Sequence, residues 1–300
     1  MADSAIELSD VTIAYGARVV ISEFSLKVPC GRVYGFVGPN GAGKTSTIRT
    51  ILGLKRARHG EVRVLNHDVT RDRSVLRRVG SLIDPPSLYP HLSGAENVSV
   101  FAHYYRVSAS DPACLLDTVG LAHAGKMRVR EYSQGMKQRL GVALALVPQP
   151  DLVILDEPMN GLDPIGIAEF RDMVLGLSRR GKTVFLSSHL LDEVSRMATD
   201  VALISRGRLV YAGSMNGLTR TVSVCLIEAS PRELAVYVLR SVGCEVSVAG
   251  EKLAVNTEVW SPSEISQLLA SRGVVLNALI PDVQESLEDV FLRLTKGDPV

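Results

Sequence analysis

Residues 38–45 read Gly-Pro-Asn-Gly-Ala-Gly-Lys-Thr, which matches the phosphate-binding pattern of Gly, four residues and Gly-Lys-Thr. The apolar residues 33–37 before it predict a buried strand, and residues 46–52 after it predict a helix. In such a strand–loop–helix unit, backbone N–H groups and the helix N-terminus bind phosphate oxygens. The sequence therefore predicts a nucleoside triphosphate site formed by Gly38, Pro39, Asn40, Gly41, Ala42, Gly43, Lys44, Thr45 and Ser46.

Four polar side chains are expected to carry the chemistry of this site. Lys44 supplies a positive charge for the β- and γ-phosphates, and the Thr45 hydroxyl can bind Mg²⁺. The apolar strand 152–155 ends at Asp156 and Glu157; we expect Asp156 to hold the metal through water and Glu157 to deprotonate the attacking water. Taken alone, these two acids fit a strand end with solvated carboxylates equally well, because an acid often follows an apolar run.

Length and composition limit the class of protein. The 300 residues, 46% of them hydrophobic, suggest two domains with enough apolar side chains for a core. A net charge of +1 gives no overall field that points to nucleic acid. Cys30, Cys114, Cys225 and Cys244 have no Cys-x-x-Cys spacing, which favours reduced thiols. The longest uncharged apolar run, residues 140–147, is too short to cross a bilayer, so any membrane role is expected to need a partner.

The hydrophobic pattern predicts an α/β protein. Residues 6–15 and 19–28 alternate like two antiparallel strands, and strands then alternate with helices up to residue 212, which indicates a parallel-sheet core beside a mixed β layer. Ser93, with Glu96 in the capping-box position, is expected to start a helical subdomain over residues 90–145. Residues 1–215 thus predict a P-loop NTPase domain.

Residues 216–300 have a different pattern. Their β-α-β-β-α-β order, followed by one more helix, predicts a small α+β domain of the ferredoxin-like class. Leu287, Val290 and Phe291 give the last helix one apolar face. Because no nucleotide motif falls in this region, we expect an accessory domain that stabilises or regulates the protein.

Five motifs, in order, identify a family resemblance. They are residues 38–45, Tyr-Ser-Gln-Gly-Met-Lys-Gln-Arg-Leu at 132–140, Asp-Glu-Pro at 156–158, Asn-Gly-Leu-Asp-Pro at 160–164 and Ser-Ser-His at 187–189. Together they resemble the ABC ATPase family over residues 6–212. The variant at 132–140 departs from the usual Leu-Ser-Gly-Gly-Gln and resembles the exporter branch that includes antibiotic-resistance and lantibiotic-immunity transporters.

The resemblance implies an ATPase that dimerises head to tail, with ATP and Mg²⁺ between the phosphate loop of one subunit and residues 132–140 of the other. Ser133 and Gly135 would then contact the γ-phosphate bound by the partner chain. Tyr15 would stack on adenine, although strands are rich in aromatic residues for other reasons. His189 would contact the γ-phosphate. Asp84 stands where the family generally has glutamine, and its carboxylate is expected to act as a further Mg²⁺ ligand.

The function expected from this resemblance is the ATP-binding and ATP-hydrolysing subunit of an ABC transporter, an exporter. It would form a homodimer, bind no nucleic acid, lie on the cytoplasmic face of the membrane and drive a separate transmembrane permease through residues 84–105. The alternative is a soluble ABC ATPase of DNA repair or translation. Repair ATPases of this type carry a long coiled coil between the phosphate loop and the segment that corresponds to residues 132–140. In this sequence, the intervening residues 46–131 lack sustained heptads. Translation factors of this type carry two such cores, whereas this sequence has one.

Overall fold

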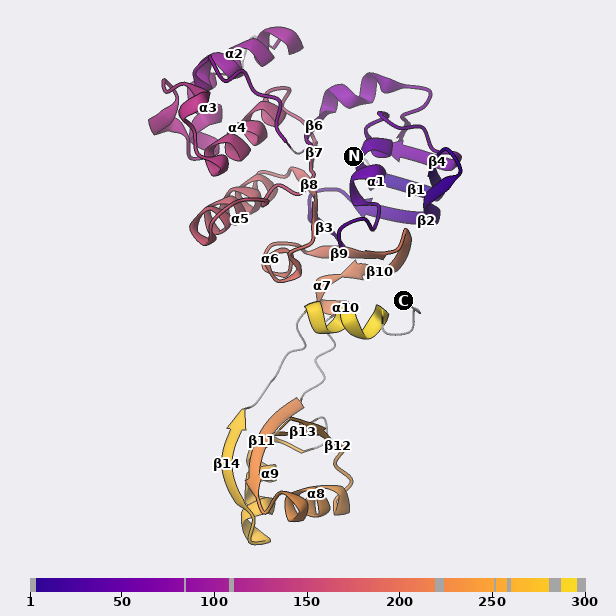
Figure 1. The fold of residues 1–300 in the computed structure, drawn as a ribbon, viewed down its shortest axis with the longest axis vertical. Coiled ribbons are helices and arrows are strands. Elements are labelled where there is room, and N and C mark those ends of the chain that lie inside the picture. The colour runs from indigo at the N-terminus through magenta and orange to yellow at the C-terminus, as the bar shows by residue number, and fades with distance from the viewer. Residues whose placement is uncertain are drawn as a thin grey trace. The chain divides into compact units, whose positions relative to one another are not determined.

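The computed structural model describes residues 4–83, 85–107, 111–218, 224–250, 252–257, 260–280 and 287–295. The chain divides into two compact units, and the division falls between Met215 and Asn216 (Figure 1). No helix among the described residues is long and apolar enough to cross a membrane. Asp84, which the sequence predicted as a metal ligand, lies outside the described residues.

The first unit is built on two sheets. The antiparallel sheet has the order β2-β1-β4-β5, with β1 at Ser4–Tyr15, β2 at Arg18–Pro29, β4 at His59–Val64 and β5 at His67–Asp68. The other sheet has the order β10-β9-β3-β8-β7-β6 and is parallel except where β10 pairs with β9. Its strands are β3 (Val33–Val37), β6 (Val79–Leu82), β7 (Leu152–Leu155), β8 (Thr183–Ser188), β9 (Asp200–Ser205) and β10 (Arg208–Ser214). The predicted α/β fold with a mixed β layer is confirmed.

Helices cover the six-stranded sheet on both sides. In Figure 1, α5 and α6 lie on one side of this sheet, and α1 lies on the other beside the antiparallel sheet, while α2, α3 and α4 form a separate group. Because both faces are covered, β3, β7, β8 and β9 are buried along their whole length. The helices are α1 (Lys44–Ile51), α2 (Gly94–Tyr105), α3 (Pro112–Thr118), α4 (Gln134–Leu146), α5 (Pro164–Arg179), α6 (Leu191–Ser195) and α7 (Met215–Leu218), with 3₁₀ turns η1 (Arg73–Arg78), η2 (Ala122–Ala124) and η3 (Val129–Glu131).

Aromatic side chains join the two sheets. The ring of Phe36 in β3 lies 6.0 Å from Phe24 in β2 and 5.5 Å from Phe185 in β8, measured between ring centroids. All three side chains are fully buried, so this contact fixes the end of β3, and with it the start of the phosphate loop, against both sheets. The predicted capping box is also confirmed: the Ser93 N–H donates to Glu96 Oε2 at 2.7 Å, and the Glu96 N–H donates to Ser93 Oγ at 3.2 Å.

The second unit is a four-stranded antiparallel sheet of order β12-β13-β11-β14 with two helices. Its elements are β11 (Val224–Ser230), α8 (Arg232–Ser241), β12 (Val246–Ala249), β13 (Lys252–Asn256), α9 (Pro262–Ser271) and β14 (Val275–Ile280), followed by α10 (Leu287–Thr295). A separate apolar core lies between this sheet and α8 and α9. The element order is β-α-β-β-α-β, on which the ferredoxin-like interpretation rests.

Candidate functional site

The phosphate loop connects the end of β3 to the start of α1. Gly41 and Gly43 have positive φ angles of 81° and 109°, which a residue with a side chain rarely adopts, and these angles turn the chain back into the helix. Gly43 is the N-cap of α1 and no side chain caps the helix, so its first N–H groups remain available to an anion. Asn40, Thr45 and Ser46 line a pocket of about 250 Å³ here, together with Val20, Gly41, Gly43, Lys44 and Glu157.

Lys44 is buried inside this loop, with only 5% of its side chain exposed. Its Nζ donates to the carbonyl oxygens of Gly38 at 2.6 Å and Pro39 at 3.2 Å. The same ammonium group lies 3.0 Å from Glu157 Oε1 at the end of β7. The loop therefore holds a buried positive charge whose partners are all oxygen atoms. Phosphate oxygens can take the place of these partners.

Glu157 is held between two other charged or polar side chains. Its Oε2 lies 2.9 Å from His189 Nδ1, and its Oε1 pairs with Lys44. Glu157 also adopts a left-handed φ of 47°, which is rare for a residue with a side chain. Lys44, Glu157 and His189 thus form a continuous row of contacts, and these are the three residues that the sequence predicted as catalytic.

Ser187 in β8 contacts both acidic residues, through the carboxylate of Asp156 and the backbone of Glu157. Its Oγ donates to Asp156 Oδ1 at 2.6 Å and accepts from the Glu157 N–H at 3.0 Å. Since β7 and β8 are parallel neighbours, their carboxyl ends meet at the same edge of the sheet. Ser187 lies in the Ser-Ser-His motif, but its two contacts depend on the register between β7 and β8 and so could not be predicted from the sequence.

The metal site predicted from the sequence relied on Thr45, Asp156 and Asp84. Asp156 is buried, Thr45 lines the pocket, and Asp84 is not among the described residues. No group of three or more His, Cys, Asp or Glu residues that could enclose a metal ion occurs in the described part of the chain. Mg²⁺ needs no such cage, because it binds through one or two carboxylates, water and substrate phosphates. A buried carboxylate and a hydroxyl beside a phosphate loop fit that mode.

Tyr15 lies beside the loop, at the end of β1. Its hydroxyl is 3.5 Å from Ser46 Oγ in α1, and its ring is 43% exposed. The Lys55 ammonium group lies 4.2 Å from the ring centroid, which is a cation–π contact. The hydrogen bond with Ser46 lowers the pKa of the Tyr15 phenol. The structure therefore places an accessible aromatic ring next to the phosphate pocket.

Ser133 and Gly135 occupy a different part of the unit. Ser133 is the N-cap of α4, and its Oγ accepts from the Met136 N–H at 3.2 Å, while Gly135 lies in the first turn of the same helix. Neither residue lines the phosphate-loop pocket of its own chain. Asp163, in the Asn-Gly-Leu-Asp-Pro motif, caps α5 by accepting from the Gly166 N–H at 2.8 Å.

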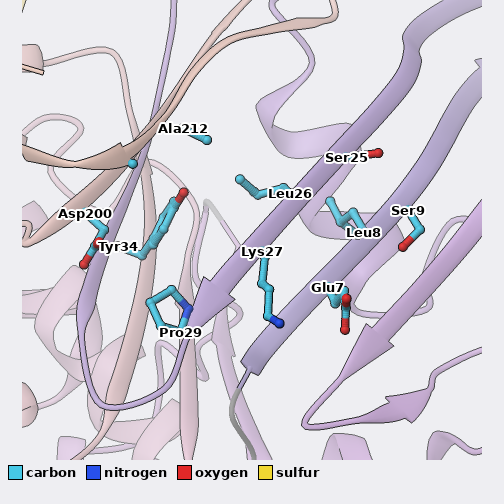
Figure 2. A pocket seen from close by; sticks show the side chains of 11 residues that line it. Glu7, Leu8, Ser9, Ser25, Leu26, Lys27, Pro29, Tyr34, Asp200 and Ala212 are labelled. Atoms are coloured by element: carbon cyan, nitrogen blue, oxygen red, sulfur yellow. The ribbon is translucent and has the colours of Figure 1, made fainter. Parts of the chain in front are cut away.

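A second pocket, of about 460 Å³, lies between β1 and β2 on one side and β3, β9 and β10 on the other (Figure 2). Glu7, Lys27, Tyr34 and Asp200 line it, and burial raises the pKa of the Tyr34 phenol. None of the motif residues lines this pocket. The nucleotide site is therefore assigned to the smaller pocket at the phosphate loop.

Comparisons with known proteins identify the family. A family model described as "ABC transporter" matches residues 21–160. The chain is 34% identical to the bacitracin transport ATP-binding protein BcrA of Bacillus licheniformis, over 98% of each chain. It is 38% identical to the lantibiotic transport ATP-binding protein SrtF of Streptococcus pyogenes, over 70% of this chain and 93% of that protein. A solved ATP-binding subunit of an ABC transporter superposes with a TM-score of 0.64 and 26% identity, covering 72% of this chain and 92% of the other.

The two neighbouring serines of β8 offer a matched test of the site. We expect Ser187→Ala to lower the rate of nucleoside triphosphate hydrolysis by about tenfold or more, because the Asp156 carboxylate loses its donor and the Glu157 N–H loses its acceptor. Ser188→Ala is the control, since the Ser188 Oγ accepts from the Leu190 N–H and, among the described residues, forms no hydrogen bond with Asp156 or Glu157. Steady-state hydrolysis by both variants checks this; equal losses would show that Ser187 orients nothing.

Proposed function

Because the chain belongs to the ABC transporter family of ATP-binding proteins, we propose that it is the ATP-hydrolysing subunit of an exporter that drives a separate transmembrane permease. Similarity to BcrA over 98% of each chain is the observation that carries this proposal. The names of these relatives concern bacitracin and lantibiotic transport, so we assign an antibiotic as the class of exported substrate. The soluble alternative in DNA repair or translation is not favoured.

The proposed catalytic cycle starts from the Lys44–Glu157 ion pair. When ATP binds, Lys44 exchanges the Gly38 and Pro39 carbonyls and the Glu157 carboxylate for oxygens of the β- and γ-phosphates. Mg²⁺, held by Thr45 and Asp156, would neutralise charge on those oxygens. Glu157 is then free to take a proton from the water that attacks the γ-phosphorus, while the bond to the bridging oxygen of ADP breaks. His189 remains in contact with Glu157 and donates toward the transferred phosphoryl group.

A complete site is proposed to need a second copy of the chain. Ser133 and Gly135 do not line the pocket of their own subunit, and the N-terminus of α4 is an anion-binding position. Head-to-tail association would place this helix end against the γ-phosphate held by the partner's loop. Closing and reopening of that dimer would be the motion that drives transport.

The permease is proposed to contact the exposed aromatic face around α2. Tyr89, Val100, Tyr104 and Tyr105 are all exposed there, and Tyr104 is 80% exposed. A gathering of exposed large hydrophobic side chains is typical of a protein–protein contact. This face overlaps the segment 84–105 that the sequence analysis assigned to the permease, and it would place the subunit on the cytoplasmic face of the membrane.

Complementation tests the shared site. Lys44→Ala lacks the phosphate charge of its own loop, and Ser133→Arg blocks the segment offered to the partner; each homodimer should be nearly inactive. In a mixture, a heterodimer keeps one intact site, so we expect recovery of up to about a quarter of the parent hydrolysis rate from random pairing. Heterodimers that form but recover no activity would contradict a site made by two chains.

Co-purification tests the permease contact. From detergent extracts of its own cells, the tagged chain should co-purify with a polytopic membrane protein. The Val100→Ser/Tyr104→Ser variant should no longer co-purify with that protein but should still hydrolyse ATP. Tyr237→Ser is the control, because Tyr237 is 72% exposed but lies in the second unit. Recovery with ribosomes or DNA in place of a membrane protein would overturn the proposed function.

A further inference from the structure

Exposed arginines gather on one face of the first unit, around two adjoining pockets. The first pocket, of about 900 Å³, lies beside the loop between α1 and β4, and Arg56, Arg71 and Arg73 line it. The second, of about 820 Å³, lies between η1 and the end of α2, and Arg73, Arg77 and Arg106 line it. Since Arg73 lines both pockets, the five side chains form one continuous arginine surface.

Most of these charges have no acidic partner. Among the described residues, Arg56, Arg73, Arg77 and Arg106 form no ion pair, and all four are exposed. Arg71 pairs with Asp68 at 3.2 Å, although its side chain is 87% exposed.

Nearby acids are engaged elsewhere. The Glu61 carboxylate pairs with Arg63 at 2.8 Å, and the Asp72 carboxylate caps η1 and contacts His67. By contrast, Arg32, Arg78, Arg139 and Arg171 all pair with acids at other places on the unit. Among the described residues, four exposed arginines that form no ion pair therefore lie around these two adjoining pockets.

Exposed apolar and aromatic side chains accompany the arginines. Leu54, 67% exposed, lines the first pocket, and Tyr104, 80% exposed, lines the second. Arginines interspersed with an exposed leucine and tyrosine are the combination found where proteins lie on a bilayer, because the cations attract anionic headgroups and the apolar groups enter the interface.

We propose that the arginine surface binds anionic phospholipid headgroups of the membrane that holds the permease. This rests on the proposed function, because Tyr104 and Tyr105, assigned to the permease contact, also line the second pocket. The five arginines carry positive charge, which anionic headgroups complement. Lipid contact beside the permease would hold the subunit at the membrane through a nucleotide cycle.

Vesicle sedimentation of the full chain tests the proposal. The chain should sediment with vesicles of equal parts phosphatidylglycerol and phosphatidylcholine, not with phosphatidylcholine alone, and added salt should release it. Arg56→Gln/Arg77→Gln should weaken binding about 25-fold, since each arginine near an anionic leaflet contributes about fivefold. Arg56→Lys/Arg77→Lys should restore most of the binding.

The control is Arg179→Gln/Arg208→Gln, which removes the same charge from exposed arginines outside the arginine surface. Equal binding by the Arg56→Gln/Arg77→Gln variant and this control, or no preference for phosphatidylglycerol, would overturn the proposal. Binding to DNA through the same arginines without vesicle binding would also overturn it, in favour of nucleic acid. ATP hydrolysis and permease co-purification, measured on the same variants, should stay unchanged. If the parent chain itself neither hydrolyses ATP nor co-purifies with a permease, that result would count against the proposed function instead.

Discussion

The ion pair between Lys44 Nζ and Glu157 Oε1, 3.0 Å long, is the interaction on which the rest of the site depends. A nearly buried ammonium group needs partners, and removing them leaves an uncompensated charge at a cost of several kcal/mol, about 3–5. Here the partners are two carbonyls of the loop and a carboxylate from another strand. In the proposed mechanism, ATP replaces Glu157 as the partner of Lys44, and the same exchange releases the proposed general base. Charge compensation would thus link binding to catalysis.

The sheet topology makes this pair possible. β3, β8 and β7 are parallel neighbours, so the phosphate loop, the Ser-Ser-His segment and the Asp-Glu segment all leave the sheet at one edge. In open α/β sheets, ligands bind outside the carboxyl ends of the strands for this reason. The Ser187 hydroxyl then links the Asp156 carboxylate to the Glu157 backbone N–H, and His189 lies at the far end of the row. Residues 32 positions apart, such as Glu157 and His189, become hydrogen-bonded neighbours.

The sequence predicted the features that depend on local pattern. The loop at 38–45, the strand 152–155 and the Ser93 capping box follow from spacing and residue type. Lys44, Glu157 and His189, predicted as catalytic, lie in one row of contacts. Features that depend on register or on distant segments could not be read in this way. β5 has only two residues, Ser187 acts through its strand neighbour, and the arginine surface combines a loop, a 3₁₀ turn and the end of a helix. Ser133 and Gly135, remote from their own pocket, gain their proposed partner only in a second chain.

Calorimetric titration of ADP and Mg²⁺ into the parent chain and Glu157→Gln tests the charge exchange most directly. ADP has β-phosphate oxygens for Lys44, but it has no γ-phosphate to be hydrolysed or to recruit a second chain. If phosphate must displace Glu157 from Lys44, Glu157→Gln should bind ADP about tenfold more tightly, because close charge pairs contribute about 1.5 kcal/mol or more. Glu193→Gln, which removes the same charge from a pair with Arg171, should bind as the parent does. Equal or weaker ADP binding by Glu157→Gln would contradict the exchange.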